Sequence, residues 1–112
     1  MRKELGKITQ VRCGIGGYQD TMLGIGFTIE GKGWGVQTPF EGTWSPDSIK
    51  VDKHTKWTEK DRSLAFDNAF RLIGSTLHKA KKKDISELVG VPVEVVFEDN
   101  TLISWRVLTE VL

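Results

Sequence analysis

The sequence predicts an α+β fold, an antiparallel sheet of about five strands with one long helix packed on one face. Residues 7–38 alternate between polar and apolar side chains with period two, as half-buried strands do. Residues 59–82 carry apolar side chains at helical spacing. Residues 91–107 alternate again around a central turn signal. The predicted order is three strands, a short fourth strand, the long helix and two final strands.

The first part of the chain is predicted to form strands over residues 7–13, 22–29 and 34–38. Glycines at 14–17 are expected to end the first strand, and residues 30–33 to form a hairpin turn between the other two. A loop containing Trp44 follows, and residues 49–51 can form a short edge strand. Ten of the twelve glycines lie in the first 42 residues, and glycines within strands mark bulges, bends or a close approach to the backbone.

The long helix is predicted from about Glu59 to about Lys82. Thr58, three residues before Asp61, is the expected N-cap. Gly74 in its interior costs about 1 kcal/mol relative to alanine, which suggests that the helix packs closely on the sheet there. The expected apolar stripe consists of Phe66, Ala69, Phe70, Ile73, Leu77 and Ala80.

The end of the chain is predicted to form a brief helix and a hairpin. The brief helix covers residues 85–89, and Gly90 and Pro92 stop it. Strands over 91–97 and 103–107 follow, joined by a turn at Asp99–Asn100 that tolerates a positive φ.

Charge is segregated along a chain that is nearly neutral as a whole. The 112 residues carry a formal net charge of +1, and we expect one domain over 1–112. Residues 1–49 are neutral, residues 50–83 carry +6 and residues 84–112 carry −5. One cysteine and two histidines exclude a disulfide scaffold and argue against a structural zinc site. No apolar run approaches the roughly 20 residues of a membrane span. The first residues resemble no secretory signal, so we expect a cytosolic protein.

Residues 14–20 form the densest cluster of glycine, polar and aromatic residues. The glycines allow a tight loop whose backbone amides face outward, and such loops hold anions or partner backbones. The alternative is a wide hairpin with a bulge. The candidate ligand-binding residues of this loop are Gly16, Gly17, Tyr18, Gln19 and Asp20.

Two tryptophans are further candidates for ligand contacts. Residues 32–35 resemble the basic-Gly-aromatic-Gly opening of an RNA-recognition motif, but the chain that follows does not fit that fold. What remains is the hypothesis that Trp34 and Trp44 are exposed on the sheet, against the alternative that they anchor the core or a loop. Residues 26–33 come close to a phosphate-binding loop, but Gly33 replaces the required hydroxyl residue.

The basic middle of the chain could follow a phosphate backbone, with Trp57 as a stacking platform. The alternative is a solvated helix end, because the helix dipole favours lysines there. The basic residues concerned are Lys50, Lys53, Lys56, Lys60, Arg71, Lys79, Lys81, Lys82 and Lys83.

The sequence contains no recognisable catalytic motif. Cys13 lies at the end of a predicted strand, His54 in a loop and His78 on the helix. A small hydrolase using Cys13 or His54 would require these residues to meet in one cleft. We therefore expect no enzyme, with no catalytic residues, no cofactor and no metal.

Four segments resemble small conserved proteins encoded by bacteriophages and prophages. They are residues 14–20, 31–36, 56–62 and 104–112. The resemblance implies a non-enzymatic binding module in the host cytoplasm, an inhibitor or nucleotide sponge directed at a host defence system. The expected partner is a host protein or a small nucleotide, with no membrane, and a homodimer is compatible with the sequence. The alternative is a single-stranded nucleic-acid-binding accessory protein that uses Lys56, Trp57, Lys79 and Lys81–Lys83.

Overall fold

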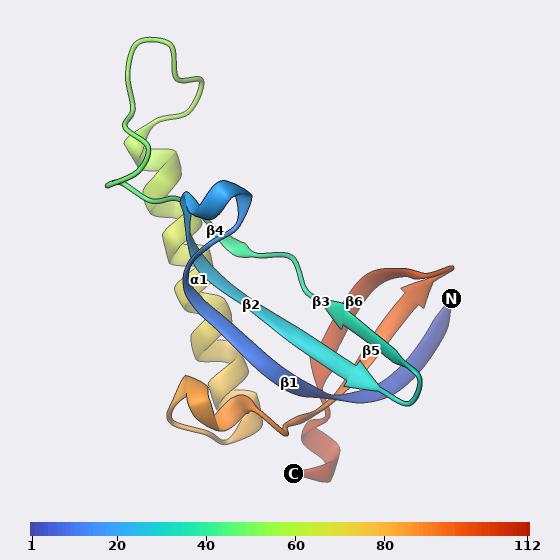
Figure 1. Cartoon of the computed structure of the whole chain (residues 1–112). Helices are drawn as coiled ribbons and strands as arrows, with labels where there is room; N and C mark the ends of the chain where they lie inside the picture. The colour runs from blue at the N-terminus through green and yellow to red at the C-terminus, as the bar shows by residue number, and fades with distance from the viewer.

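The computed structural model describes all 112 residues and confirms the α+β class. Figure 1 shows one long helix behind a curved sheet, and a loop before the helix that projects beyond the body of the molecule. The elements in chain order are β1 (Arg2–Gly16), η1 (Tyr18–Asp20), β2 (Met22–Gly31), β3 (Trp34–Gln37), β4 (Glu41–Trp44), α1 (Glu59–Ala80), η2 (Ile85–Leu88), β5 (Pro92–Glu98), β6 (Thr101–Val107) and η3 (Thr109–Val111).

The six strands form one antiparallel sheet in the order β3-β2-β1-β5-β6, with β4 also paired to β2. The two halves of β2 have different neighbours, since residues 28–31 pair with β3 and residues 22–25 pair with β4. The strand β1 is shared in the same way. Its residues 2–7 pair with β5, and its residues 6–16 pair with β2. The sheet is therefore offset, and the second half of β1 has a neighbour on one side only.

The core lies between one face of this sheet, α1 and η2. Ile8, Ile25, Phe27 and Ile29 are fully buried, and they alternate along β1 and β2 as the period-two pattern predicts. The other buried hydrophobic residues of this cluster are Ala80, Leu88, Val91, Val93, Val95, Phe97 and Val107.

Two strand predictions are wrong. The glycines at 14–16 do not end the first strand, because β1 continues to Gly16 in register with Met22. Residues 49–51 are not a strand, and the fourth strand is β4, over 41–44. The strand β4 can pair there because Gly24 and Gly42 lie opposite each other, and a Cβ on Gly24 would overlap the Glu41 carbonyl.

The helix begins where the sequence predicts. Thr58 and Asp61 form a capping box, in which the Thr58 backbone N–H donates to Asp61 Oδ2 at 2.8 Å and the Asp61 N–H donates to Thr58 Oγ1 at 3.2 Å. The helix ends at Ala80, because Lys81 adopts a left-handed conformation with φ of 59°.

The predicted inner face of the helix is partly wrong. Phe70 is 75% exposed, and Gly74 is exposed with open space where a side chain would lie. The helix therefore does not pack closely on the sheet at Gly74. Its buried residues are Arg62, Ala69, Thr76 and Ala80. These buried residues lie on the side of α1 that contacts β4 and β2. With the helix in this orientation, Phe70 is directed away from the core.

The C-terminal part follows the prediction. A capping box at Asp84 starts η2, and the hairpin β5–β6 turns through Asp99, whose φ is 55°. The last strand begins at Thr101, two residues earlier than predicted, and η3 was not predicted. None of the helices, α1 included, has the length and apolar character that a bilayer span requires.

Candidate functional site

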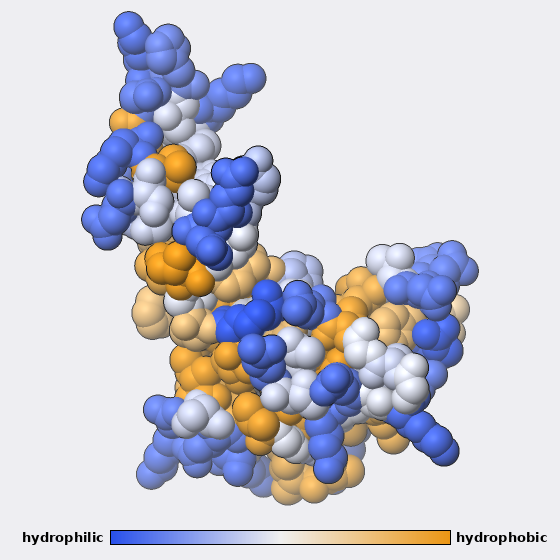
Figure 2. All heavy atoms as spheres, viewed as in Figure 1, coloured by the Kyte–Doolittle hydropathy of each residue, from blue (hydrophilic) through white to orange (hydrophobic).

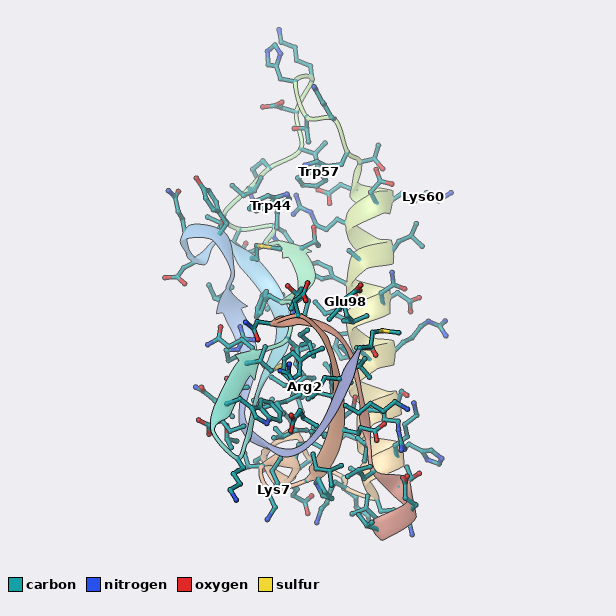
Figure 3. All side chains as sticks on the ribbon, turned by 90° about the vertical axis from the view of Figure 1, so that its right-hand side faces the viewer. Arg2, Lys7, Trp44, Trp57, Lys60 and Glu98 are labelled. Atoms are coloured by element: carbon teal, nitrogen blue, oxygen red, sulfur yellow. The ribbon has the colours of Figure 1, made fainter.

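An open pocket of about 530 Å³ lies at the end of the molecule where η1, the end of β4 and the loop before α1 meet. This volume is within the range of sites that bind small molecules. Figure 3 shows Trp44 and Trp57 at this end, below the tip of the projecting loop. The pocket is lined by Tyr18, Gln19, Thr21, Trp44, Ile49, His54, Thr55, Lys56 and Trp57.

One wall is the turn between β1 and β2. Gln19 and Asp20 both have left-handed conformations, with φ of 52° and 55°, and each such residue costs about 1 kcal/mol or more. The turn is closed by Thr21, whose Oγ1 donates to the Tyr18 carbonyl at 2.6 Å. Ser45 N–H donates to the Thr21 carbonyl at 2.8 Å and joins the turn to the end of β4. Local strain of this kind is concentrated at binding sites. Here the hydrogen-bonded turn places Tyr18 and Gln19 at the pocket.

The opposite wall is the loop over residues 45–57. The Asp52 carboxylate accepts a hydrogen bond from the His54 backbone N–H at 2.8 Å, and the Asp52 carbonyl accepts one from the Thr55 N–H at 3.1 Å. Ile49 N–H donates to the Ser45 carbonyl at 2.9 Å. The side chains of His54, Thr55 and Lys56 are therefore presented by a hydrogen-bonded turn.

Arg62 supports this wall from the first turns of α1. Its side chain is 3% exposed, and its Nη2 donates to the Ile49 carbonyl at 2.7 Å. Its guanidinium also covers one face of the Trp57 ring, with Cζ 4.8 Å from the ring centroid. Nε lies 3.1 Å from Glu59 Oε1 without hydrogen-bond geometry, and Nη1 has no hydrogen-bond partner. One buried cation thus fixes two residues that line the pocket.

The lining combines aromatic, hydrogen-bonding and basic groups. Tyr18, Trp44 and Trp57 offer rings, Gln19 offers an amide, and Lys56 offers a positive charge. No carboxylate is among the nine lining residues. Such a lining suits a planar ligand that carries negative charge and hydrogen-bonding edges.

The pocket brings together residues that the sequence had assigned to two different hypotheses. Tyr18, Gln19 and Trp44 came from the ligand-binding prediction, and Lys56 and Trp57 came from the nucleic-acid prediction.

The other residues of the 14–20 loop support the turn and do not line the pocket. A Cβ on Gly17 would come within 2.6 Å of Met22 Sδ, and one on Gly16 would contact the Phe40 ring. Asp20 is exposed beside the pocket. Gly17, with φ of 68°, is therefore required by the shape of the turn, whereas Gly16 ends β1 and makes only an ordinary contact with Phe40.

Trp34 does not belong to this site, and the hypothesis of an exposed aromatic is wrong for it. The ring lies over Gly6 and Gly31 and meets the Phe97 ring edge-on at 5.3 Å. It packs against the core cluster. It lies beside Gly31, nine residues along β2 from Met22, which corresponds to about 30 Å of strand.

The lysines of the basic segment are divided between the two ends of α1. Lys56 lies at the pocket, whereas Lys79 and Lys81–Lys83 lie at the C-terminal end of a 22-residue helix, about 33 Å away along its axis. Lys81 is the left-handed C-cap residue and ends the helix. The basic residues are therefore not one continuous surface with Trp57.

Cys13 and His54 do not meet in one cleft, as a hydrolase using both would require. Cys13 lines an apolar groove of about 220 Å³ between β2 and α1, and His54 lines the pocket.

Sequence reasoning missed the lining residues Thr21, Ile49 and Thr55, and it named His54 only as a hydrolase candidate. It also missed Arg62, which supports the wall from behind. Arg62 had a recognisable signal, because it lies four residues before Phe66 and seven before Ala69 on the inner face of the helix. The expectation that Arg62 lies off the apolar stripe of the helix is wrong, because its side chain is 3% exposed.

Comparison of the chain with known protein families, curated proteins and solved structures finds no match.

Proposed function

We propose that this protein is a non-enzymatic binding module whose pocket holds a nucleotide. The single observation that carries the proposal is the lining of the pocket, which combines aromatic rings, an amide and basic side chains and lacks carboxylates. A nucleotide is planar at its base and anionic at its phosphate, so each part has a counterpart in the lining.

The parts of the pocket suggest how such a ligand is held. Arg62 covers one face of Trp57, which leaves the other face to stack on a base. A base–aromatic stack contributes about 1 to 3 kcal/mol. The Gln19 amide can pair with the edge of the base, because it offers both a donor and an acceptor. Lys56 and His54 are the nearest groups for the phosphate.

The resemblance to small phage proteins gives this binding a proposed role. Such a protein would act in the host cytoplasm as a nucleotide sponge or an inhibitor directed at a host defence system. A sponge needs no catalytic groups, because it acts by holding its ligand.

Single-stranded nucleic acid is the second candidate, and the +6 charge of residues 50–83 favours it. The separation of Lys56 from Lys79 and Lys81–Lys83 by the length of α1 weakens it, because these lysines do not form one patch with Trp57. Short nucleotides and oligonucleotides therefore discriminate between the two candidates.

The test is isothermal titration calorimetry with nucleoside monophosphates, cyclic dinucleotides and a single-stranded oligonucleotide. We expect a short nucleotide to bind, and Tyr18→Ala and Lys56→Ala each to weaken its binding about tenfold, corresponding to about 1.4 kcal/mol. Tyr18 is exposed, so its truncation leaves the fold intact.

The matched control is Lys60→Ala. Lys60 is exposed in the first turn of α1, and Figure 3 shows its side chain directed away from Trp44. We expect this variant to bind the nucleotide as the unchanged protein does. Binding of none of the short nucleotides, or equal loss of affinity in the control, would contradict the proposal. Salt-sensitive binding of the oligonucleotide alone would favour the second candidate.

A further inference from the structure

The second half of β1 is an open edge of the sheet. The pairing of β1 with β5 ends at Lys7, and the last hydrogen bonds on that side join Ile8 to Val91 and Gly90 at 3.0 and 2.7 Å. From Thr9 to Gly16 the strand pairs with β2 alone. Eight residues of β1 therefore have one edge without a neighbouring strand.

The backbone groups that face this edge can be identified from Phe27. Its N–H donates to Thr38 Oγ1 at 2.9 Å and its carbonyl accepts from the Thr38 N–H at 2.8 Å, so both groups point away from β1. Val11, opposite Phe27, consequently exchanges no hydrogen bonds with it. The N–H and C=O groups of Val11, and by alternation those of Cys13 and Ile15, point to the open edge.

The side chains beside this edge are apolar and exposed. Ile15 is 59% exposed, and Cys13 is exposed as well. On the same side, Cys13 and Leu23 line the groove that Phe66, Phe70 and Ile73 complete from α1. Figure 2 shows apolar surface on the flank of the molecule where β1 passes in front of α1 in Figure 1.

The other two sheet edges are obstructed. The outer edge of β2 is covered by two short strands, β3 and β4, separated by residues 38–40 with Pro39. The outer strand β6 carries Arg106, which is ion-paired to Glu94 and Glu110. Proline, short strands and charged side chains are the usual means of preventing edge pairing.

The open stretch of β1 has no such protection. Its only charged residue is Arg12, on the opposite face, where the guanidinium donates to the Thr38 carbonyl at 3.0 Å and lies over the Phe40 ring. An edge with free backbone groups and apolar flanks favours the addition of a strand.

We propose that this edge pairs with the same edge of a second copy of the chain. The two β1 strands run antiparallel about a two-fold axis at Cys13, which joins the sheets of the two copies into one. The segment is self-complementary in this register, because Val11 lies opposite Ile15 of the second copy and Arg12 opposite its Gly14. Val11, Cys13 and Ile15 of each copy then exchange backbone hydrogen bonds with Ile15, Cys13 and Val11 of the other copy. Phe70 lies beside the joined edge.

The register makes Cys13 a direct probe. Hydrogen-bonded antiparallel partners have Cα atoms about 5.5 Å apart, which is within the range that a disulfide bridges. Cys13 is the only cysteine, so any disulfide joins two chains. Oxidation by diamide, which takes up the two thiol hydrogens, should convert the folded dimer to a disulfide-linked one, and urea should abolish this selective linkage.

The test measures mass by light scattering and sedimentation from micromolar to millimolar concentrations. We expect twice the 12.6 kDa chain mass, with the Cys13→Ser variant still dimeric. Ile15→Lys should shift the protein to monomer, with at least a tenfold weaker dimer, because it places a charge at the joined edge. The matched control is Ile103→Lys, since Ile103 is 51% exposed on the outer strand β6.

Circular dichroism verifies that both lysine variants are folded. A monomer at every concentration would overturn the proposal. So would a dimer that Ile103→Lys disrupts and Ile15→Lys does not, since that result assigns the interface to β6. A dimer in which diamide leaves Cys13 unlinked would overturn the proposed register.

Discussion

The guanidinium of Arg62 lies over the ring of Trp57, with Cζ 4.8 Å from the ring centroid, while its Nη2 holds the carbonyl of Ile49 at 2.7 Å. These two contacts join the first turns of α1 to Ile49 and Trp57, two residues of the loop that forms one wall of the pocket. A cation–π contact at a desolvated site contributes about 2 kcal/mol, and a hydrogen bond to a charged group about 1.5 to 3 kcal/mol. The stability of the fold and the shape of the pocket therefore depend on the same side chain.

Arg62→Ala should lower the free energy of unfolding by about 2 to 4 kcal/mol, because it removes both contacts and leaves the Ile49 carbonyl without its donor. Urea denaturation followed by tryptophan fluorescence measures the change. The control is Arg71→Ala on the same helix, since Arg71 is 76% exposed and pairs only with Asp67. We expect the control to change stability by less than about 0.5 kcal/mol, and an equal loss in both variants would contradict a special role for Arg62.

Gly31→Ala should destabilise the protein by about 1 to 3 kcal/mol, as overpacking does. A Cβ at Gly31 would overlap the Trp34 ring, which also meets the Phe97 ring edge-on, so the tryptophan would have to shift. Thermal denaturation measures the loss, and a shift in tryptophan emission reports the displaced ring. Gly35→Ala in the same hairpin is the control, because its Cβ would meet Glu30 Cγ at an ordinary 3.4 Å. Unchanged stability of Gly31→Ala would show that the ring can move.

Gly74→Ala should stabilise the protein by about 0.5 to 1 kcal/mol. Gly74 lies in the interior of α1 with open space around the position of a side chain, so alanine gains helix propensity without a clash. The measurement is the midpoint of urea denaturation. A loss of stability would mean that the helix packs more closely at this position than the structure shows.

The carboxylate of Glu110 should titrate far below an ordinary glutamate. Two hydrogen bonds from the Arg106 guanidinium, at 2.9 and 2.8 Å, lower the pKa of Glu110 from 4.5 to about 2. A lowered carboxyl pKa in the folded state stabilises the fold above the unfolded pKa, and this contribution is lost as pH falls from about 4.5 towards 2. Carboxyl NMR shifts as a function of pH measure the pKa directly.

Arg106→Gln provides the control for Glu110. Without the guanidinium we expect the pKa of Glu110 to return to the ordinary range of about 4 to 5. Because both side chains are about half exposed, the effect on overall stability should be small. A Glu110 pKa that stays low in Arg106→Gln would assign the shift to the backbone of η3.

The elements that depend on residues close together in the sequence were predicted well. The capping box of Thr58 and Asp61, the turn at Asp99 and the alternation of Ile25, Phe27 and Ile29 all follow from side chains a few residues apart. The sequence also supplied five of the nine pocket residues, because a glycine-rich turn and a loop with tryptophans are recognisable without knowing the fold.

Pairing partners and helix orientation could not be predicted in the same way. β4 exists because Gly24 and Gly42 allow two backbones to approach, and these residues are 18 positions apart. Phe70 satisfied the helical spacing and is nevertheless exposed, because the rotation of α1 is set by its contact with β4 and β2. Trp34 satisfied the pattern of an exposed ring and instead fills the space left by Gly6 and Gly31.

Local chemistry therefore determined the α+β class, the start of the long helix and the presence of a polar turn that includes Tyr18–Asp20. Only the packing of distant segments decided that Tyr18, Trp44 and Trp57 share one pocket, that Arg62 supports it, and that the basic residues divide between two ends of the molecule. The physical reason is that caps and turns are stabilised by contacts within a few residues, whereas a pocket forms where backbone segments far apart in the chain are brought together by sheet pairing and core burial.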